Sequence, residues 1–145
     1  MYGKKKSQPQ EWESTGGRRG YIFVSLHHSL LYSAAYKDLS PRARMLYAYM
    51  KAKGWKGENK SPNIFPDIPY VREKDRSLLF TFTGSDALAT GLYTANYAKP
   101  FKQDKDDLVS HGFIDDAAPN ITRGNGKAKV FKFSARWEKW PTESP

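Results

Sequence analysis

The sequence predicts a single α+β domain, and three observations in its second half support this. A run rich in β-forming residues covers 78–83. Two helical segments then follow, separated by a turn at Gly91. The second of them closes on His111-Gly112-Phe113-Ile114, before a β-hairpin around Asn125-Gly126, the preferred type I′ turn pair. This order is typical of a winged helix-turn-helix, here with an additional N-terminal strand and short helix.

Length and charge divide the chain into three parts. A chain of 145 residues has room for one core, which we expect within residues 21–140. Residues 1–20 carry five cations against Glu11 and Glu13 and lack apolar periodicity, so they predict a flexible basic arm. Whether this arm contacts DNA or is only a solvated terminus stays open. Residues 141–145 are expected to be a C-terminal tail.

The first half of the domain is expected to hold a strand and two helices. Residues 21–24 are apolar and rich in β-formers, which predicts the strand. Residues 26–36 carry apolar side chains at helical spacing, which predicts a short helix. Ser40-Pro41 is a strong start signal for a second helix, which Gly54 would end. Its apolar face would consist of Ala43, Leu46, Tyr47 and Met50.

An irregular stretch, residues 55–77, separates this helix from a strand over 78–83 with Phe80 and Phe82 on one face. Ser85 is the expected cap of the next helix, and Asp86 suits its positive end. The inner face of that short helix would be Ala87, Leu88 and Leu92.

The helix after Gly91 has two contrasting stripes. Tyr97, Phe101 and Leu108 form the apolar stripe, with Val109 at its border. The opposite stripe carries Ala95, Lys99, Lys102, Gln103, Asp106 and Ser110. Pro100 disfavours helix at the residue before it, so the helix either starts near Lys99 or is kinked there.

Several classes of function lack their signatures. The chain has no cysteine, which excludes disulfides and thiolate sites and is compatible with a reducing cytoplasm. No apolar run approaches a membrane span. His27 and His28 are adjacent and would point apart, so no metal is expected, and no cofactor motif occurs. Asp115-Asp116 is expected to begin a loop. We therefore expect that the protein is not an enzyme.

The net charge of +9 agrees in sign with a nucleic-acid partner. On the second helix and the turn before it, the candidate DNA contacts are Thr94, Asn96, Lys99, Lys102 and Gln103, since Lys pairs with guanine and Gln with adenine in the major groove. In the hairpin, or wing, they are Arg123, Asn125, Lys127 and Lys129. The alternative is an ordinary solvated surface, because Asp104, Asp106 and Asp107 offset the nearby lysines.

Three motifs resemble one family of proteins. Tyr36-Lys37-Asp38-Leu39-Ser40-Pro41-Arg42-Ala43-Arg44-Met45-Leu46-Tyr47 resembles a run near the start of plasmid replication initiators of the "initiator A" N-terminal family. Leu108-Val109-Ser110-His111-Gly112-Phe113-Ile114 resembles the end of the recognition helix in that family. Phe131-Lys132-Phe133-Ser134-Ala135-Arg136-Trp137 is similar to the end of related plasmid, phage and integrative-element proteins.

The resemblance covers about residues 21–137 and implies DNA binding in a bacterial mobile element. The expected function is non-catalytic binding of double-stranded DNA in replication, transfer or transcriptional control. The alternative is a winged-helix protein–protein module in a replication or transfer assembly. The DNA sequence, the oligomeric state and partners other than DNA, such as a second copy or other replication proteins, stay open. Trp137 and Trp140 are expected to pack the end of the domain.

Overall fold

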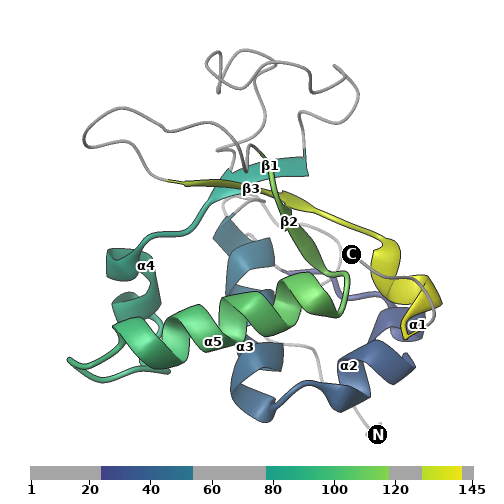
Figure 1. The fold of residues 1–145 in the computed structure, drawn as a ribbon, viewed down its shortest axis with the longest axis horizontal. Helices are drawn as coiled ribbons and strands as arrows, with labels where there is room; N and C mark the ends of the chain where they lie inside the picture. The colour runs from purple at the N-terminus through teal and green to yellow at the C-terminus, as the bar shows by residue number, and fades with distance from the viewer. Residues whose placement is uncertain (1–23, 54–77, 118–128, 142–145) are drawn as a thin grey trace, which may run out of the picture.

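The computed structural model describes residues 24–53, 78–117 and 129–141, and its helices lie on one side of a small sheet (Figure 1). In chain order the elements are α1 (His28–Leu31), α2 (Ala34–Asp38), α3 (Pro41–Lys53), β1 (Leu79–Thr81), α4 (Gly84–Ala89), α5 (Ala98–Ser110), β2 (Ile114–Asp116), β3 (Val130–Phe133) and the 3-10 helix η4 (Arg136–Lys139). The predicted α+β class is confirmed. The predictions for the arm (1–20), the segment 55–77 and the hairpin turn lie outside the described residues.

β3 is the central strand of the sheet and pairs antiparallel with both β1 and β2. Phe80 lies opposite Phe131, and Ile114 lies opposite Phe133. The rings of Phe80 and Phe133 are stacked with centroids 4.2 Å apart. The strand predicted over 78–83 is therefore confirmed at Leu79–Thr81, and the aromatic side chains of β1 and β3 pack over the helices.

The helix predicted to start at Ser40-Pro41 is confirmed as α3, whereas its predicted end at Gly54 lies outside the described residues. Pro41 is its first residue, and the Ser40 hydroxyl accepts from the amide of Ala43 at 3.1 Å. All four predicted apolar positions are buried in the core: Ala43, Leu46, Tyr47 and Met50. The apolar spacing therefore identified the face that packs against the sheet and α5.

The single helix predicted over 26–36 is wrong, because the structure has two short helices that meet at Ser33. The Ser33 hydroxyl accepts from the amide of Tyr36 at 3.1 Å and donates to the carbonyl of Leu30 at 2.7 Å. These local bonds end α1 and cap α2 in place of a continuous backbone ladder. Of the strand predicted over 21–24, only Val24 is described, and it lies outside any strand.

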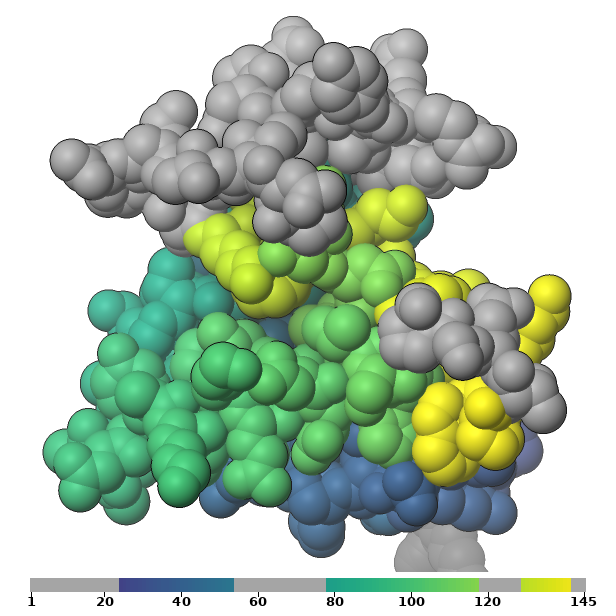
Figure 2. Space-filling view, viewed as in Figure 1, coloured from purple at the N-terminus to yellow at the C-terminus, as the bar shows by residue number. Residues whose placement is uncertain are grey.

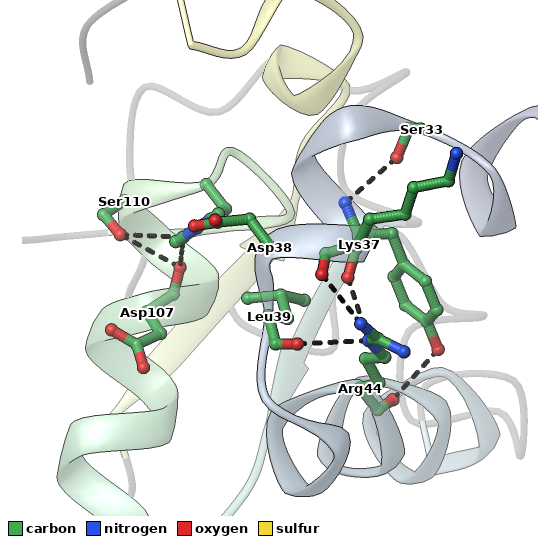
Figure 3. Close-up of polar contacts among 9 residues, drawn as sticks. Ser33, Lys37, Asp38, Leu39, Arg44, Asp107 and Ser110 are labelled. Carbon is green, nitrogen blue, oxygen red and sulfur yellow. Dashed lines mark hydrogen bonds and ion pairs between the residues drawn. The ribbon is translucent and has the colours of Figure 1, made fainter.

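Arg44 ties the end of α2 to α3 (Figure 3). Its guanidinium donates to the carbonyls of Tyr36 at 3.0 Å, Leu39 at 3.1 Å and Lys37 at 2.7 Å. The Tyr36 carbonyl also accepts from the amide of Leu39 at 3.2 Å, so Arg44 adds a side-chain donor to the carbonyls at the C-terminal end of α2. The motif at residues 36–47, which resembles the plasmid initiators, therefore forms the junction between α2 and α3. Tyr36 and Leu39 of this motif are also core residues.

α4 begins two residues earlier than predicted, because Thr83 rather than Ser85 is its cap. The Thr83 hydroxyl accepts from the amide of Asp86 at 3.2 Å, and the Asp86 carboxylate accepts from the amide of Thr83 at 2.8 Å. This reciprocal pair is a capping box. The inner face is correct for Ala87, which is buried, and for Leu92, which packs on the core, but wrong for Leu88, which is exposed.

The chain turns sharply after α5 at Gly112, which has φ +87°. A Cβ there would lie 2.5 Å from the backbone nitrogen of Trp137, so only glycine fits. Trp137 stacks on Phe113 and Trp140 stacks on His111, which confirms that both tryptophans pack the end of the domain. The expectation that Asp115-Asp116 begins a loop is wrong, since both residues lie in β2.

Candidate nucleic-acid interface

α5 has the two faces that its sequence predicts. Phe101 and Leu108 are buried, and Val109 is half-buried at the border. Of the predicted opposite stripe, the members within α5 are all exposed: Lys99, Lys102, Gln103, Asp106 and Ser110. Ala95 is also exposed but lies in the turn before α5, so its place in the stripe was predicted wrongly. In the space-filling view α5 (green) runs across the face toward the viewer, beside the yellow-green surface of β3 (Figure 2). The candidate contacts on this helix are therefore accessible to a large partner.

Pro100 lies in the first turn of α5, which settles where that helix begins. The helix starts at Ala98, and Pro100 is its third residue, where an amide has no intrahelical acceptor. The amide of Phe101 then donates to the carbonyl of Tyr97 at 2.9 Å. The first of the two predicted alternatives is correct, and Lys99 and Gln103 therefore lie one turn apart on the same face.

Thr94 and Asn96 are exposed in the turn between α4 and α5. Tyr97 is half-buried and packs on the core, with its ring centroid 6.3 Å from that of Phe101. The hydroxyl of Tyr97 also fills the space where a side chain at Gly84 would begin, 2.2 Å from an ideal Cβ. Tyr97 is therefore a core residue, while Thr94 and Asn96 stay candidates for contact.

Asp104 is the main correction to the sequence interpretation, which counted it among the surface acids of α5. The residue is only 1% exposed. Its carboxylate accepts from Arg42 of α3 at 2.6 and 3.3 Å and from the Tyr93 hydroxyl at 2.6 Å. Burial, followed by the hydrogen bond to Asp104, raises the pKa of Tyr93, so that the phenol stays a donor. Asp104 therefore contributes no free negative charge to the exposed face.

A groove of about 510 Å³ lies between α5 and the strands β2 and β3. Lys102 and Lys105 line it from α5, and Lys129 lines it from the position just before β3. Lys129 is exposed and forms an ion pair with Asp116 at 3.0 Å. Of the four wing candidates only Lys129 is described; Arg123, Asn125 and Lys127 lie outside the described residues.

Arg136 fixes β2 and the end of α5 from the other side. Its guanidinium donates to the carbonyl of Val109 at 3.0 Å and pairs with Asp115. His111 closes α5 in a related way, because its Nδ1 donates to the carbonyl of Asp107 at 2.7 Å and its Nε2 lies 2.8 Å from the Asp38 carboxylate (Figure 3). The end of the helix is therefore anchored to α2, β2 and η4.

Sequence reasoning missed four of these residues: Arg42, Tyr93, Lys105 and Arg136. Arg42 and Arg136 lie inside the resembling motifs, but a motif does not show which carboxylate an arginine meets. The burial of Asp104 could have been predicted from the sequence. At 100° per residue it lies on the same side of α5 as Phe101 and Leu108, which belong to the apolar stripe.

The histidines have structural neighbours. His27 lies 3.2 Å from the Ser29 hydroxyl, and the ring of His28 lies 4.7 Å from that of Tyr32. Within residues 24–53, 78–117 and 129–141, no three His, Asp or Glu side chains gather closely enough to hold a metal ion. In the same parts of the chain, no helix has both the length and the apolar character needed to cross a membrane.

Comparison of the chain with protein-family models, with curated protein sequences and with solved structures found no match in any of the three. The resemblance to plasmid initiators therefore stays a prediction.

Proposed function

We propose that this protein binds duplex DNA without catalysing a reaction, by placing the exposed face of α5 in the major groove. The order α3, β1, α4, α5, β2, β3, with β3 in the centre of the sheet, supports a winged helix-turn-helix. In that arrangement β2 and β3 are the strands that carry the wing, and Lys129 is at its base beside the DNA backbone.

The observation that carries this proposal is the burial of Asp104. With that carboxylate bound to Arg42, the N-terminal half of the exposed face presents Lys99, Lys102 and Gln103. Asp106 and Asp107 follow toward the C-terminal half, which usually points away from DNA in this motif. Cationic and amide side chains at the leading end of a helix are the groups that contact phosphates and base edges.

The resemblance described above suggests the biological setting. On that basis we propose a cytoplasmic role in the replication, transfer or transcriptional control of a plasmid, phage or integrative element.

A second candidate function is a protein–protein module with the same fold. It is favoured by exposed apolar side chains at the C-terminal end of α1 and on α3 and α4, which are more typical of a protein interface than of a DNA interface. These residues are Leu31, Tyr32, Met45, Tyr49 and Leu88.

Fluorescence anisotropy with a random-sequence duplex of about 20 base pairs at about 50 mM salt tests the proposal. We expect the wild type to bind and Lys99→Gln/Lys102→Gln to bind at least about tenfold more weakly, since each lost charged contact is worth roughly 1.5–3 kcal/mol. Lys37→Gln/Lys132→Gln is the matched control. It removes the same charge from α2 and from the face of β3 opposite Phe131. Absence of binding by the wild type would favour the protein–protein module.

A further inference from the structure

Lys105 has an unusual position among the three lysines of the groove. Its ammonium lies 4.3 Å from the ring centroid of Phe101 and 5.9 Å from that of Phe131. Among the described residues it has these aromatic neighbours but no ion-pair partner. A half-buried cation of this kind is stabilised by the faces of the rings and stays available to an anion.

Positive charge is crowded around this ammonium. Burial lowers the pKa of Lys105, and the charges of Lys129 and Lys102 lower it further, while Asp106 acts in the opposite direction. The groove therefore holds three cations close enough to repel one another. An anion bound between them would relieve that repulsion.

The other two lysines are already paired with carboxylates of the groove. Lys102 pairs with Asp106 at 2.7 Å, and Lys129 pairs with Asp116 at 3.0 Å. The side chains of Lys102 and Asp106 are 74% and 62% exposed. Ion pairs between side chains this exposed are weak and break readily. A phosphate could therefore displace such a carboxylate from its lysine.

We propose that the groove between α5 and the strands β2 and β3 binds one phosphate group, with Lys105 as its central ligand and Asp106 and Asp116 as internal competitors. The phosphate is a backbone phosphate of duplex DNA, so this inference rests on the function proposed above. The competing carboxylates would keep binding to any one phosphate weak until the helix face is also engaged.

The test measures duplex affinity as a function of salt for the full chain. Lys105→Gln should lower affinity on the order of tenfold and reduce the log–log salt slope by about 0.9, the value of one phosphate contact. Lys105→Arg keeps the cation and should restore the slope. Asp106→Asn/Asp116→Asn should tighten binding by at least about twofold, because two repelling charges are removed. Lys37→Gln is the charge-matched control outside the groove.

Two results distinguish failure of the phosphate site from failure of the proposed DNA-binding function. If the wild type binds duplex but Lys105→Gln behaves like Lys37→Gln, the phosphate site is overturned and DNA binding stands. If the wild type binds no duplex, the proposed DNA-binding function is contradicted. Titration with inorganic phosphate then tests whether the groove binds phosphate. In that case shifts of the Val109 and Ser110 amide signals in the wild type, absent in Lys105→Gln, would support a site for free phosphate, and no shifts in the wild type would overturn it.

Discussion

Arg42 and Asp104 form a two-pronged ion pair between α3 and α5, with Nε–Oδ2 at 2.6 Å and Nη2–Oδ1 at 3.3 Å. The Arg42 guanidinium also lies over the ring of Tyr93, 5.4 Å from its centroid. Asp104 lies on the buried side of α5 with Phe101 and Leu108, so the pair joins this side of the helix to α3. Lys99 and Gln103 lie on the exposed side of the same helix.

Arg42→Met should lower the free energy of unfolding by about 3 kcal/mol, because it leaves a buried carboxylate with only Tyr93 as a partner. Lys102→Met is the matched control. Its ion pair with Asp106 is exposed on both sides, so the change should stay within about 0.5 kcal/mol. Urea denaturation of both variants measures this difference. Equal effects would mean that the buried pair does not hold α5 in place.

Two glycines of positive φ should respond differently to alanine. Gly91→Ala at φ +77° has open space around the new methyl group, so it should cost only about 1–2 kcal/mol for the left-handed backbone. Gly112→Ala at φ +87° also collides with the backbone of Arg136 and Trp137, so roughly a further 1–3 kcal/mol is expected. Thermal unfolding compares them. A Gly112→Ala protein as stable as Gly91→Ala would contradict the tight turn after α5.

The cap of α4 should make stability depend on pH at the acidic end. Burial alone would raise the pKa of Asp86, but the ion pair with Lys53 and the bonds from Thr83 outweigh it and lower the pKa. A carboxyl with a lowered folded pKa stabilises the protein above its unfolded pKa of about 4 and loses that contribution as pH falls. Asp86→Asn should therefore be less stable than wild type at neutral pH, and the gap should narrow below about pH 4. A gap that does not change with pH would contradict this account.

The elements that the sequence predicted well are those in which local spacing decides the structure. α3 has both a Ser-Pro start and a four-residue apolar face, and α5 has two clear stripes. The errors fall where one hydroxyl decides between alternatives. Ser33 ends one helix and caps the next. Thr83, and not the expected Ser85, caps α4, because Asp86 three residues later completes a capping box with it. Apolar periodicity does not register such bonds.

The candidate site was predictable in its exposed part and not in its buried part. Lys99, Lys102 and Gln103 follow from helical geometry alone. The pairing of Asp104 with Arg42 joins residues 62 positions apart, and Lys105 of α5 contacts Phe131 of β3. Contacts of this kind depend on how the helices and the sheet pack, which no local pattern contains.

Base recognition should reside in α5. Gln103→Ala or Lys99→Ala should change the preferred DNA sequence, because each good bidentate contact discriminates by about 1–3 kcal/mol. Deletion of residues 1–19 should lower affinity without changing the preference, since a basic arm mostly contacts phosphates. Selection from a random-sequence pool followed by sequencing compares the three proteins. If only the deletion alters the selected sequence, the arm and not α5 is the reader.

The salt dependence of duplex binding by the wild-type protein tests the central claim most directly. Lys99, Lys102 and Lys129, with Arg123 and Lys127 of the predicted wing, should give a log–log slope on the order of −3 to −5, at about 0.9 per phosphate contact. A slope in this range would support DNA binding through α5 and the wing. A flat dependence, or no binding to duplex at low salt, would contradict it.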